Sequence, residues 1–404
     1  MLSFENARQK VIDVASAENR PRAVEIISLT SAQNRILAVP ILADRDYPPF
    51  NRAARDGFAV RAADAAEPGR VLKLAGEVKA GDSFTGSLAP GQCIQIMTGA
   101  AVPSGADAVV MIEHTKVLPG QVTLERYAMP GQNIVARGRE AKAGQTVLSP
   151  GARLSYAELA IAAQVGQAEL QAYVQPRVAI LSTGDEVVSF EEQPGALQIR
   201  NSNSVSLAAQ IALAGGEAVV LGNARDNMED LREKIAKGLK ADILVLSGGV
   251  SMGKYDLVET VLGEFGTEFY FDQVAIRPGK PAVFGKCGST LVFGLPGNPV
   301  STMVTFELFV VPAIDLLGKT SPRPLPLFNA RLAAPVRQKA GLTHFLPARI
   351  EWLPGEATVQ ETSWQGSGDI VALGIANGYL VVRPERLEMA AGELAEVLPR
   401  RGVF

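Results

Sequence analysis

The amino-acid sequence predicts a multidomain α/β protein whose central domain holds a doubly wound, mostly parallel sheet. The chain has 404 residues, and a single hydrophobic core rarely organises more than about 250 to 300 residues. Its middle part alternates strand-like and helix-like patterns, which is typical of a parallel sheet covered by helices on both faces. Short β-type runs separated by Gly and Pro occur before and after that part. We therefore expect smaller domains on both sides of the central one.

Four domains are expected along the chain. Two helical patterns flank a region of β-type runs, which predicts a discontinuous helical N-terminal domain, 1–45 plus 141–172, interrupted by an inserted β domain, 46–140. The α/β domain follows at 173–322, and a β-barrel-like domain is predicted for 323–404. The β-type runs that support the two β domains are "GFAV", "CIQIM", "DAVVMIE" and "VTLERY" in the first, and "HFLPARIEW", "GYLVVRPE" and "LAEVLP" in the second.

The α/β domain is predicted from a regular alternation of patterns. Its expected strands are "RVAIL", "EAVVLG", "ADILVL", "EFYFDQVAI" and "TLVFGL", and its expected helices begin with "SVSLAAQ", "MEDLREK" and "DLVETVL" and at residue 299. The last helix is very apolar but contains Glu307, Pro312 and Asp315. We interpret it as a buried helix with a break and not as a membrane span.

Composition excludes several classes of protein. The 39 basic and 42 acidic residues give a net charge of -3, without the basic excess typical of proteins that bind nucleic acid or anionic membranes. Cys93 and Cys287 lie in apolar runs, which indicates reduced thiols in a cytoplasmic protein. Two histidines, with no C-x-x-C or H-E-x-x-H spacing, argue against a zinc site. The N-terminal segment lacks the apolar core of a signal peptide.

Polar loops follow four of the predicted strands. They read "STGDE" at 182–186, "NARDN" at 223–227, "SGGVSMGKYD" at 247–256 and "PGNPVS" at 296–301. Each loop alone is explained as an ordinary turn or helix cap. Together they should converge, because ligands bind beyond the carboxyl ends of the strands in open parallel sheets.

These loops bring carboxylates beside glycine-rich backbone. The spacing of the three glycines in "SGGVSMGKYD" fits neither the dinucleotide-binding fingerprint nor the P-loop. Clustered carboxylates repel one another unless a cation lies among them, and carboxylates beside an anion cradle are typical of Mg²⁺ bound to a phosphate. The pattern therefore points to a phosphorylated or nucleotide-bearing ligand. The carboxylates concerned are Asp185, Glu186, Asp226 and Asp256.

Two further motifs carry candidate residues. "IRPGKP" presents Arg277 and Lys280 on a backbone restricted by prolines, which suits an oxyanion; a solvated basic turn is the alternative. In the β domain Asp56 precedes a glycine and Thr98 lies in "IMTGAAVPSG", where a plain β-turn explains both residues.

The motifs resemble those of a known family when they are read in order. "YPPFNRAARDGFAV", "IMTGAAVPSGADAVV", "STGDEV", "SGGVSMGKYDLV", "RPGKPAVFG" and "GLPGNPVS" resemble the MoeA family of molybdopterin molybdenumtransferases and the E domain of gephyrin. The resemblance implies an elongated homodimer of four-domain subunits, whose third domain has the molybdopterin-binding fold. It implies insertion of molybdate into adenylylated molybdopterin with Mg²⁺-dependent release of AMP. Further implied partners are a molybdopterin adenylyltransferase and the apoproteins of molybdoenzymes.

The resemblance also implies roles for particular residues. Glu186, Asp226 and Asp256 would hold the metal and substrate, Lys280 would face molybdate, and Asp56 and Thr98 would reach the pocket from the partner subunit. Counted among the catalytic residues on this basis are Asp56, Thr98, Asp185, Glu186, Asp226, Asp256 and Lys280. The expected substrate-binding residues are Gly248, Gly249, Ser251, Gly253, Arg277, Lys280, Pro296, Gly297, Asn298, Pro299 and Ser301.

Several positions depart from the family's usual pattern. "NRAARDGFA" replaces the usual "DNSAMDGYA", Glu140 stands where an aspartate is usual, and Pro347 stands where an arginine is usual. Two other functions stay open at this point. A molybdopterin adenylyltransferase needs only the α/β domain, and a non-catalytic scaffold related to gephyrin would tolerate the altered β-domain motif.

Overall fold

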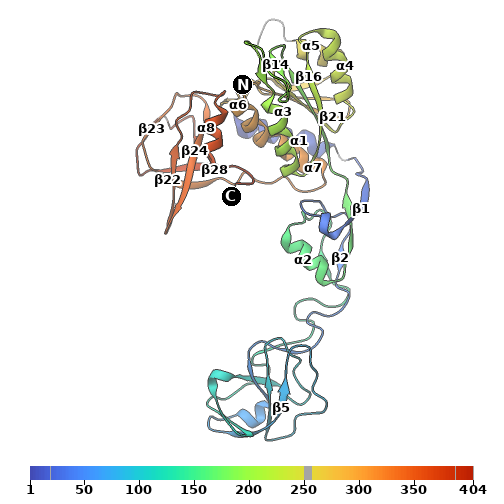
Figure 1. Ribbon diagram of the computed structural model, residues 1–404, viewed down its shortest axis with the longest axis vertical. Coiled ribbons are helices and arrows are strands. Elements are labelled where there is room, and N and C mark those ends of the chain that lie inside the picture. The colour runs from blue at the N-terminus through green and yellow to red at the C-terminus, as the bar shows by residue number, and fades with distance from the viewer. Residues whose placement is uncertain (19, 250–256, 387, 404) are drawn as a thin grey trace.

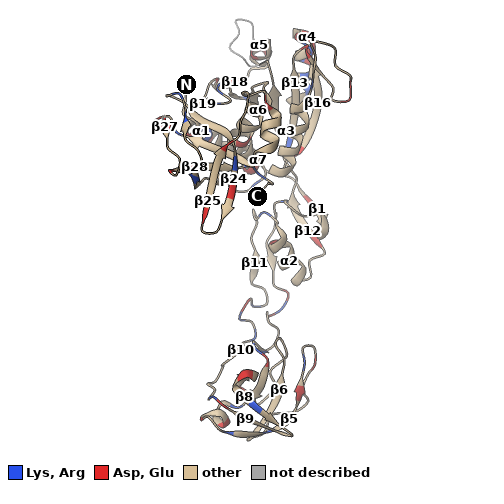
Figure 2. Ribbon diagram, turned by 60° about the vertical axis from the view of Figure 1, so that its left-hand side comes forward, with Lys and Arg blue, Asp and Glu red and all other residues tan. Residues whose placement is uncertain are grey.

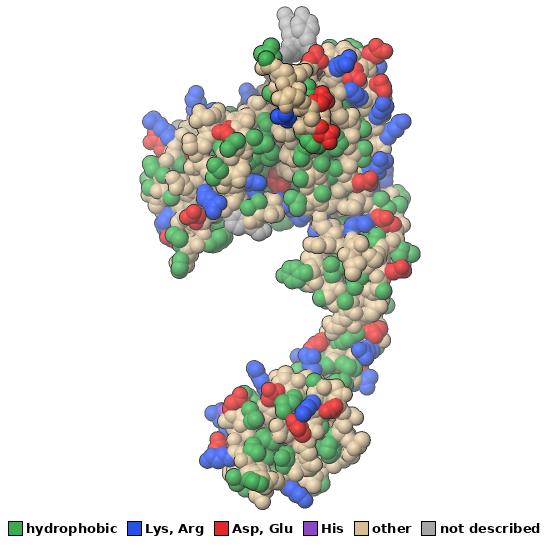
Figure 3. Space-filling model, in the orientation of Figure 1, with side chains coloured by type: hydrophobic (Ala, Val, Ile, Leu, Met, Phe, Trp, Pro, Cys, Tyr) green, Lys and Arg blue, Asp and Glu red, His purple; other side chains and the backbone are tan. Residues whose placement is uncertain are grey.

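The computed structural model describes residues 1–18, 20–249, 257–386 and 388–403 and has an elongated, curved outline. The α/β domain and the C-terminal β domain lie side by side at one end (Figure 1). A small unit that contains β1, β2 and α2 extends from them, and the inserted β domain lies at the far end. The space-filling view shows open space between that β domain and the C-terminal β domain (Figure 3).

The central sheet is mixed but mostly parallel, as the sequence predicts. Its six strands have the order β16-β13-β17-β21-β20-β18; the first four are parallel to one another, and β20 and β18 are antiparallel to their neighbours. The bounds are β13 (Arg177–Thr183), β16 (Glu217–Ala224), β17 (Ile243–Ser247), β18 (Glu268–Phe271), β20 (Val283–Cys287) and β21 (Thr290–Leu295). The expected long strand over 268–276 is split, because β19 (Ile276–Arg277) pairs with the C-terminal sheet instead.

Helices cover both faces of this sheet, which confirms the doubly wound arrangement. Alternate residues of a strand point to opposite faces: Val178 and Ile180 of β13 join one hydrophobic cluster, and Ala179 and Leu181 join the other. The helices are α3 (Ser202–Ala214), α4 (Met228–Gly238), α5 (Leu257–Glu264), α6 (Pro299–Thr305) and α7 (Val311–Leu317).

The apolar segment from residue 299 forms one continuous helix without the expected break. Between α6 and α7 the backbone passes through a π-helical segment, η4 (Phe306–Val310). Pro312 cannot donate to the carbonyl four residues earlier, and that carbonyl, of Leu308, accepts a hydrogen bond from Arg8 Nη1 at 2.6 Å instead. This is the one helix in the described part of the chain long and apolar enough to cross a membrane, and most of it is buried in the core.

The two acids in this helix are paired with arginines from other parts of the chain. Asp315 is 1% exposed, and its Oδ1 lies 2.7 Å from Arg153 Nη2 and 2.7 Å from Arg323 Nη2. Glu307 Oε1 lies 2.6 Å from Arg401 Nη2. Because Arg153, Arg323 and Arg401 come from three separate segments, these ion pairs fix the N-terminal unit and the C-terminal segment to the α/β domain.

The first helix packs elsewhere than the sequence led us to expect. We assigned it to the N-terminal domain, but α1 (Phe4–Ala17) buries Phe4, Ala7, Val11 and Ala15 in the core of the α/β domain. Its apolar residues three and four apart form one face, and that face contacts α7. The four-domain division remains our proposal, with α1 as part of the α/β body.

The remaining N-terminal unit is mixed and not mainly helical. Ile27, Leu37, Leu154 and Leu170 contribute to a separate small core. Its elements are β1 (Val24–Ser28), η1 (Leu29–Ser31), β2 (Ile41–Leu42), β11 (Thr146–Leu148), α2 (Tyr156–Gln164) and β12 (Glu169–Tyr173). The antiparallel pairs β1–β12 and β2–β11 join segments far apart in sequence, which is how the chain returns after the insertion.

The inserted domain is a curled sheet with strand order β7-β4-β6-β5-β9-β8. Phe58, Cys93, Val110 and Leu124 are buried in one of its two small cores. Its bounds are β3 (Arg52–Ala53), β4 (Gly57–Val60), η2 (Ala62–Ala65), β5 (Val71–Val78), β6 (Gln92–Ile96), β7 (Ala108–Met111), η3 (Ile112–His114), β8 (Thr115–Leu118), β9 (Gln121–Leu124) and β10 (Ile134–Val135). All four predicted runs form strands here.

The C-terminal domain is a closed five-stranded barrel, because β24 pairs with both β25 and β26. The three predicted runs form three of its five strands, β24, β26 and β28, and Pro347 lies in β24 opposite Tyr379. The bounds are β22 (Phe328–Leu332), β23 (Val336–Arg337), β24 (Thr343–Leu353), β25 (Glu356–Glu361), α8 (Ile370–Ile375), β26 (Gly378–Val382), β27 (Glu388–Met389) and β28 (Leu394–Pro399).

Candidate functional site

A cavity of about 650 Å³ lies beyond the carboxyl ends of the parallel strands. The polar loops that follow β13, β16, β17 and β21 all reach it, so the predicted convergence of these loops is present. The residues that line it are Ser182, Thr183, Gly184, Glu186, Val187, Ile199, Arg200, Asn201, Ser202, Asn203, Asp226, Ser247, Gly248, Gly249, Pro281, Pro296, Gly297, Asn298, Pro299, Gly368 and Ile370.

The glycine turn after β17 brings backbone close to backbone. Gly248 has a φ of 92°, and a Cβ there would lie 2.9 Å from the carbonyl oxygen of Thr183. A Cβ on Gly297 would lie 3.4 Å from the Cα of Gly248. Only glycine accommodates both the left-handed backbone and the close approach. The Thr183 hydroxyl beneath this turn is buried and has no hydrogen-bond partner in the described part of the protein.

Two of the predicted carboxylates, Glu186 and Asp226, face this cavity. Burial raises the pKa of the Asp226 carboxyl, and the negative charges of Asp185 and Glu186 raise it further. Asp185 lines a neighbouring groove and not the cavity, and its Oδ1 accepts a hydrogen bond from the Asp226 amide at 3.1 Å. The three acids are therefore close enough to repel one another, which is the condition under which a cation binds.

The acidic side chains near the cavity can be compared with the ligands that a metal ion requires. Among the residues that the structure describes, no group of three or more His, Cys, Asp or Glu side chains could hold a metal ion by itself. Mg²⁺ is usually bound by one or two carboxylates together with substrate phosphates and water. Glu186 and Asp226 fit that pattern, and Asp256, the third predicted ligand, lies outside the described residues together with Ser251 and Gly253.

The beginning of α3 also lines the cavity, although its sequence does not indicate this. Asn203 Nδ2 donates to Ser247 Oγ at 2.8 Å and to the carbonyl of Gly297 at 2.7 Å, and so joins two strand-end loops. Asn201 caps the helix by accepting from the Ser204 amide at 3.0 Å. "NSNS" before a helix is typical of a simple N-cap, so no sequence signal separated Asn203 from that role.

The C-terminal barrel supplies one wall of the cavity through Gly368 and Ile370. Asn298 Nδ2 donates to Ser367 Oγ at 2.9 Å, and the Val300 amide donates to the Ser367 carbonyl at 3.0 Å. These contacts hold the barrel segment against the start of α6. Nothing in the sequence around Ser367 indicates this contribution, because the contact joins residues almost seventy positions apart.

The "IRPGKP" turn lies beside the cavity, and neither of its two cationic residues is among those that line it. Pro281 lines the cavity, whereas Arg277 lines a separate hollow of about 360 Å³ with Glu361 and Trp364. Lys280 is exposed, and its carbonyl accepts a hydrogen bond from the Val274 amide at 2.9 Å. The turn is therefore anchored through its backbone.

The "PGNPVS" loop also has some residues that line the cavity and one that does not. Pro296, Gly297, Asn298 and Pro299 line the cavity as expected. Ser301 is 3% exposed within α6, and its carbonyl accepts a hydrogen bond from the Thr305 hydroxyl at 2.8 Å. The structure therefore places Ser301 in the helix core and not on the cavity wall.

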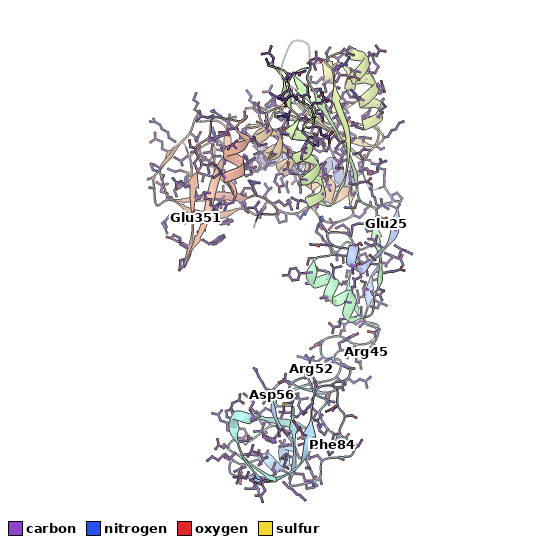
Figure 4. The ribbon with its side chains drawn as sticks, in the orientation of Figure 1. Glu25, Arg45, Arg52, Asp56, Phe84 and Glu351 are labelled. Atoms are coloured by element: carbon purple, nitrogen blue, oxygen red, sulfur yellow. The ribbon has the colours of Figure 1, made fainter. Side chains whose placement is uncertain are left out.

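Asp56 and Thr98 lie in the inserted β domain, far along the molecule from the cavity. Figure 4 shows Asp56 at the edge of this domain that faces the open space. The Thr98 hydroxyl and amide donate to Asp56 Oδ1 and lower the pKa of that carboxyl. Nearby, Arg52 Nη2 lies 2.6 Å from Glu140 Oε1. Within one chain the structure does not bring these residues to the strand-end cavity.

Charge does not single out another surface. Basic and acidic residues are interspersed over the described molecule (Figure 2). Neither charge forms one continuous block on the ribbon in this view.

Three family models match consecutive parts of the chain. Residues 2–166 match the MoeA N-terminal region, residues 179–316 match a probable molybdopterin binding domain, and residues 329–399 match the MoeA C-terminal region. Among curated relatives, the molybdopterin molybdenumtransferase of Haemophilus influenzae is 34% identical over 99% of this chain and 98% of its own length. The Bacillus subtilis enzyme is 33% identical over 93% and 89%.

A solved structure shares the whole architecture. The molybdopterin biosynthesis MoeA protein from Pyrococcus horikoshii is 27% identical, covers 99% of this chain and 100% of its own, and superposes with a TM-score of 0.79. Fold, cavity and relatives together define an enzyme of molybdenum cofactor biosynthesis with a molybdopterin-binding domain. The chain belongs to the MoeA family, the molybdopterin molybdenumtransferases.

Proposed function

We propose that this transferase joins molybdate to adenylylated molybdopterin in the strand-end cavity, with release of AMP. The observation that carries the proposal is the meeting of Glu186 and Asp226 with the glycine turn of Gly248 and Gly249 at one sheet edge. The turn carries no side chains at Gly248 and Gly249, so a phosphate can approach its backbone closely. The carboxylates suit the cation that accompanies it.

Glu186 and Asp226 are proposed to hold Mg²⁺, with Asp256 as a further ligand. When bound, the ion would offset negative charge on the phosphate oxygens. The raised pKa of Asp226 supports this assignment, because burial and the nearby acids disfavour its charge until a cation arrives. Asp185 is proposed to orient the Asp226 backbone through the hydrogen bond that it accepts from the amide.

Lys280 is proposed to bind molybdate and Arg277 to assist from the adjoining hollow. The turn between them holds Gly279 at a φ of 108°, where a Cβ would lie 2.5 Å from Thr305 Cγ2, so glycine is required. A fixed turn directs a compact ammonium toward a small dianion better than a free surface lysine does.

The active unit is proposed to be a homodimer in which Asp56 and Thr98 of one subunit complete the cavity of the other. Both residues are exposed in the inserted β domain, away from the cavity of their own chain, and the hydrogen bonds from Thr98 favour the ionised form of Asp56.

A cytoplasmic location is also proposed for this protein. Cys93 and Cys287 are free, and burial raises the pKa of the Cys93 thiol to about 11, so that it stays an unreactive thiol. A molybdopterin adenylyltransferase and the apoproteins of molybdoenzymes are proposed as protein partners.

The test is incubation of the pure protein with adenylylated molybdopterin, molybdate and Mg²⁺, with AMP and the molybdenum-containing cofactor measured together. Glu186→Gln and Asp226→Asn should raise the Mg²⁺ concentration needed for half-maximal AMP release. Unchanged Mg²⁺ dependence in both variants would contradict the proposed ligands. Formation of adenylylated molybdopterin from ATP and molybdopterin would indicate the adenylyltransferase activity instead.

A further inference from the structure

Asn223, which is not among the predicted site residues, holds the loop that carries two of the carboxylates. It lies near the end of β16, the edge strand of the central sheet. Its Nδ2 donates to the carbonyl oxygen of Gly184 at 2.8 Å and to that of Val187 at 3.1 Å. Those carbonyls lie on either side of Asp185 and Glu186. One amide group therefore fixes both ends of the acidic pair.

The position requires a neutral donor. If the amide were turned round, the Asn223 Oδ1 would face two carbonyl oxygens, which cannot donate to it. In the observed orientation Oδ1 is buried and has no hydrogen-bond partner among the residues that the structure describes. An aspartate would have the same shape but would place a third negative charge beside Asp185 and Glu186.

The backbone of Asn223 is itself anchored. Its carbonyl accepts a hydrogen bond from Lys234 Nζ at 2.6 Å, and the same ammonium lies 2.8 Å from Asp230 Oδ2 on α4. The backbone from which the side chain extends is thus fixed relative to α4. A side chain held in this way can define the position of a loop that it contacts.

The loop needs such a restraint for two reasons. Gly184 has a φ of 124°, and a glycine backbone has more conformational freedom than that of any other residue type. Asp185 Oδ1 lies 3.1 Å from the Asp226 amide nitrogen, and Glu186 and Asp226 line the same cavity, so that like charges gather at this loop. Without a cation this repulsion pushes Glu186 away from Asp226, and the hydrogen bonds from Asn223 oppose that movement.

We propose that Asn223 is a positioning residue that holds Glu186 beside Asp226 before substrate and cation bind. The inference rests on the proposed role of those two carboxylates. It predicts that removal of the Asn223 amide changes the loop itself, which can be measured without any substrate.

The experiment compares Asn223→Ala with the wild type by amide hydrogen exchange and by steady-state AMP release. The Val187 amide donates to the Gly184 carbonyl at 3.2 Å, and the Ile199 amide donates to the Glu186 carbonyl at 2.8 Å. Both amides should exchange roughly tenfold faster in the variant. Because a displacement of about 1 Å can cost about a hundredfold in rate, kcat should fall roughly ten- to a hundredfold, with little change in the half-saturating concentration of adenylylated molybdopterin.

Thr290→Val is the matched control. The Thr290 hydroxyl also contacts two carbonyl oxygens, those of Leu239 and Ala241, both at 2.9 Å, but at the opposite end of the same sheet. It should lower the free energy of unfolding without changing exchange at Val187 and Ile199 or kcat. Asn223→Asp, which keeps the side-chain shape, should behave like Asn223→Ala and serves if the alanine variant does not fold.

The outcomes separate this inference from the proposed function. Wild-type exchange at Val187 and Ile199 in both Asn223 variants would show that the residue does not hold the loop. Faster exchange with wild-type kcat would show that holding the loop does not serve the reaction, and the inference would again be wrong. The role of Glu186 is judged separately by the Mg²⁺ dependence of Glu186→Gln.

Discussion

Asp56 Oδ1 accepts two hydrogen bonds from Thr98, at 2.7 Å from the hydroxyl and 2.6 Å from the backbone amide. Hydrogen bonds donated to an ionised carboxylate stabilise its charged form. The bond from the Thr98 hydroxyl lowers the pKa of the Asp56 carboxyl most, and the bond from the Thr98 amide lowers it further. An exposed charge is thus held in one orientation at the edge of the inserted β domain that faces the open space (Figure 4). In the proposed homodimer this carboxylate would complete the cavity of the partner subunit.

We therefore expect complementation between two inactive variants. Asp56→Asn and Glu186→Gln should each release little AMP alone, because each dimer would lack one essential carboxylate in both of its sites. After subunit exchange, half of the dimers are mixed and each of these has one intact site, so activity should return to about a quarter of wild type. Activity measured before and after mixing checks this. Full activity of a monomeric wild type, or no recovery in demonstrably mixed dimers, would contradict the dimeric site.

Replacement of Asp226 should stabilise the protein while it impairs the reaction. The pKa of Asp226 is raised in the folded state, so folding favours the protonated carboxyl and the charged form at neutral pH is unfavourable. Asp226→Asn should therefore raise the free energy of unfolding at pH 7, by no more than about 1 kcal/mol because the group is partly exposed and screened. The gain should shrink as pH falls through the carboxyl range, where the wild type becomes protonated.

Urea unfolding of both proteins at a series of pH values from 7 downward tests this. Glu217→Gln, at the other end of β16, is the control, because Glu217 is far from the acidic loops and contacts Arg177 only at 3.9 Å. Asp226→Asn less stable than wild type at pH 7 would mean that the carboxylate makes a favourable contact in the empty site.

The fold could be predicted from the sequence where contacts are local or periodic. The alternation of patterns gave the parallel sheet, and the short β runs gave both β domains. The packing of α1 could not be predicted, because its apolar face would suit any neighbouring core and chain order alone suggested the wrong one. The break expected in the helix from residue 299 is a π-helical segment within a continuous helix. The helix continues through Pro312 because Arg8, three hundred residues away in sequence, satisfies the carbonyl that proline leaves free.

The site could be predicted only where a loop directly follows a strand. Glu186 and Asp226 are brought together by sheet topology, which the sequence indicates. Asn203, Asn223 and Gly368 act through contacts across separate segments, and their residue types have ordinary roles in turns and caps. The family's motifs do not indicate which asparagine or glycine contacts the site and which only forms a turn or a helix cap.

The buried carboxylate of Asp315 should be essential for stability. It contacts Arg153 and Arg323 and is excluded from solvent. Asp315→Asn leaves two arginines without their counter-charge, and loss of one partner of a buried ion pair typically costs about 3 to 5 kcal/mol. Urea unfolding at neutral pH measures the loss in the free energy of unfolding.

Glu264→Gln, which removes the exposed partner of Arg232, is the control and should lower the free energy of unfolding by less than about 1 kcal/mol. Equal losses in the two variants would mean that the buried pair contributes no more than a surface one.

The last prediction concerns Lys280, beside the cavity residue Pro281. Its backbone is fixed by the Val274 amide and by the tight packing of Gly279 against Thr305, so the side chain starts from a defined position beside the cavity. Lys280→Ala should raise the half-saturating molybdate concentration roughly ten- to a hundredfold, since a charge-assisted hydrogen bond contributes about 1.5 to 3 kcal/mol. Binding of adenylylated molybdopterin should change little. Lys237→Ala, which removes an exposed ammonium paired with Glu233 on α4, is the control. A molybdate titration that is the same for both variants rejects the assignment, and weaker pterin binding in Lys280→Ala would assign the ammonium to the phosphate instead.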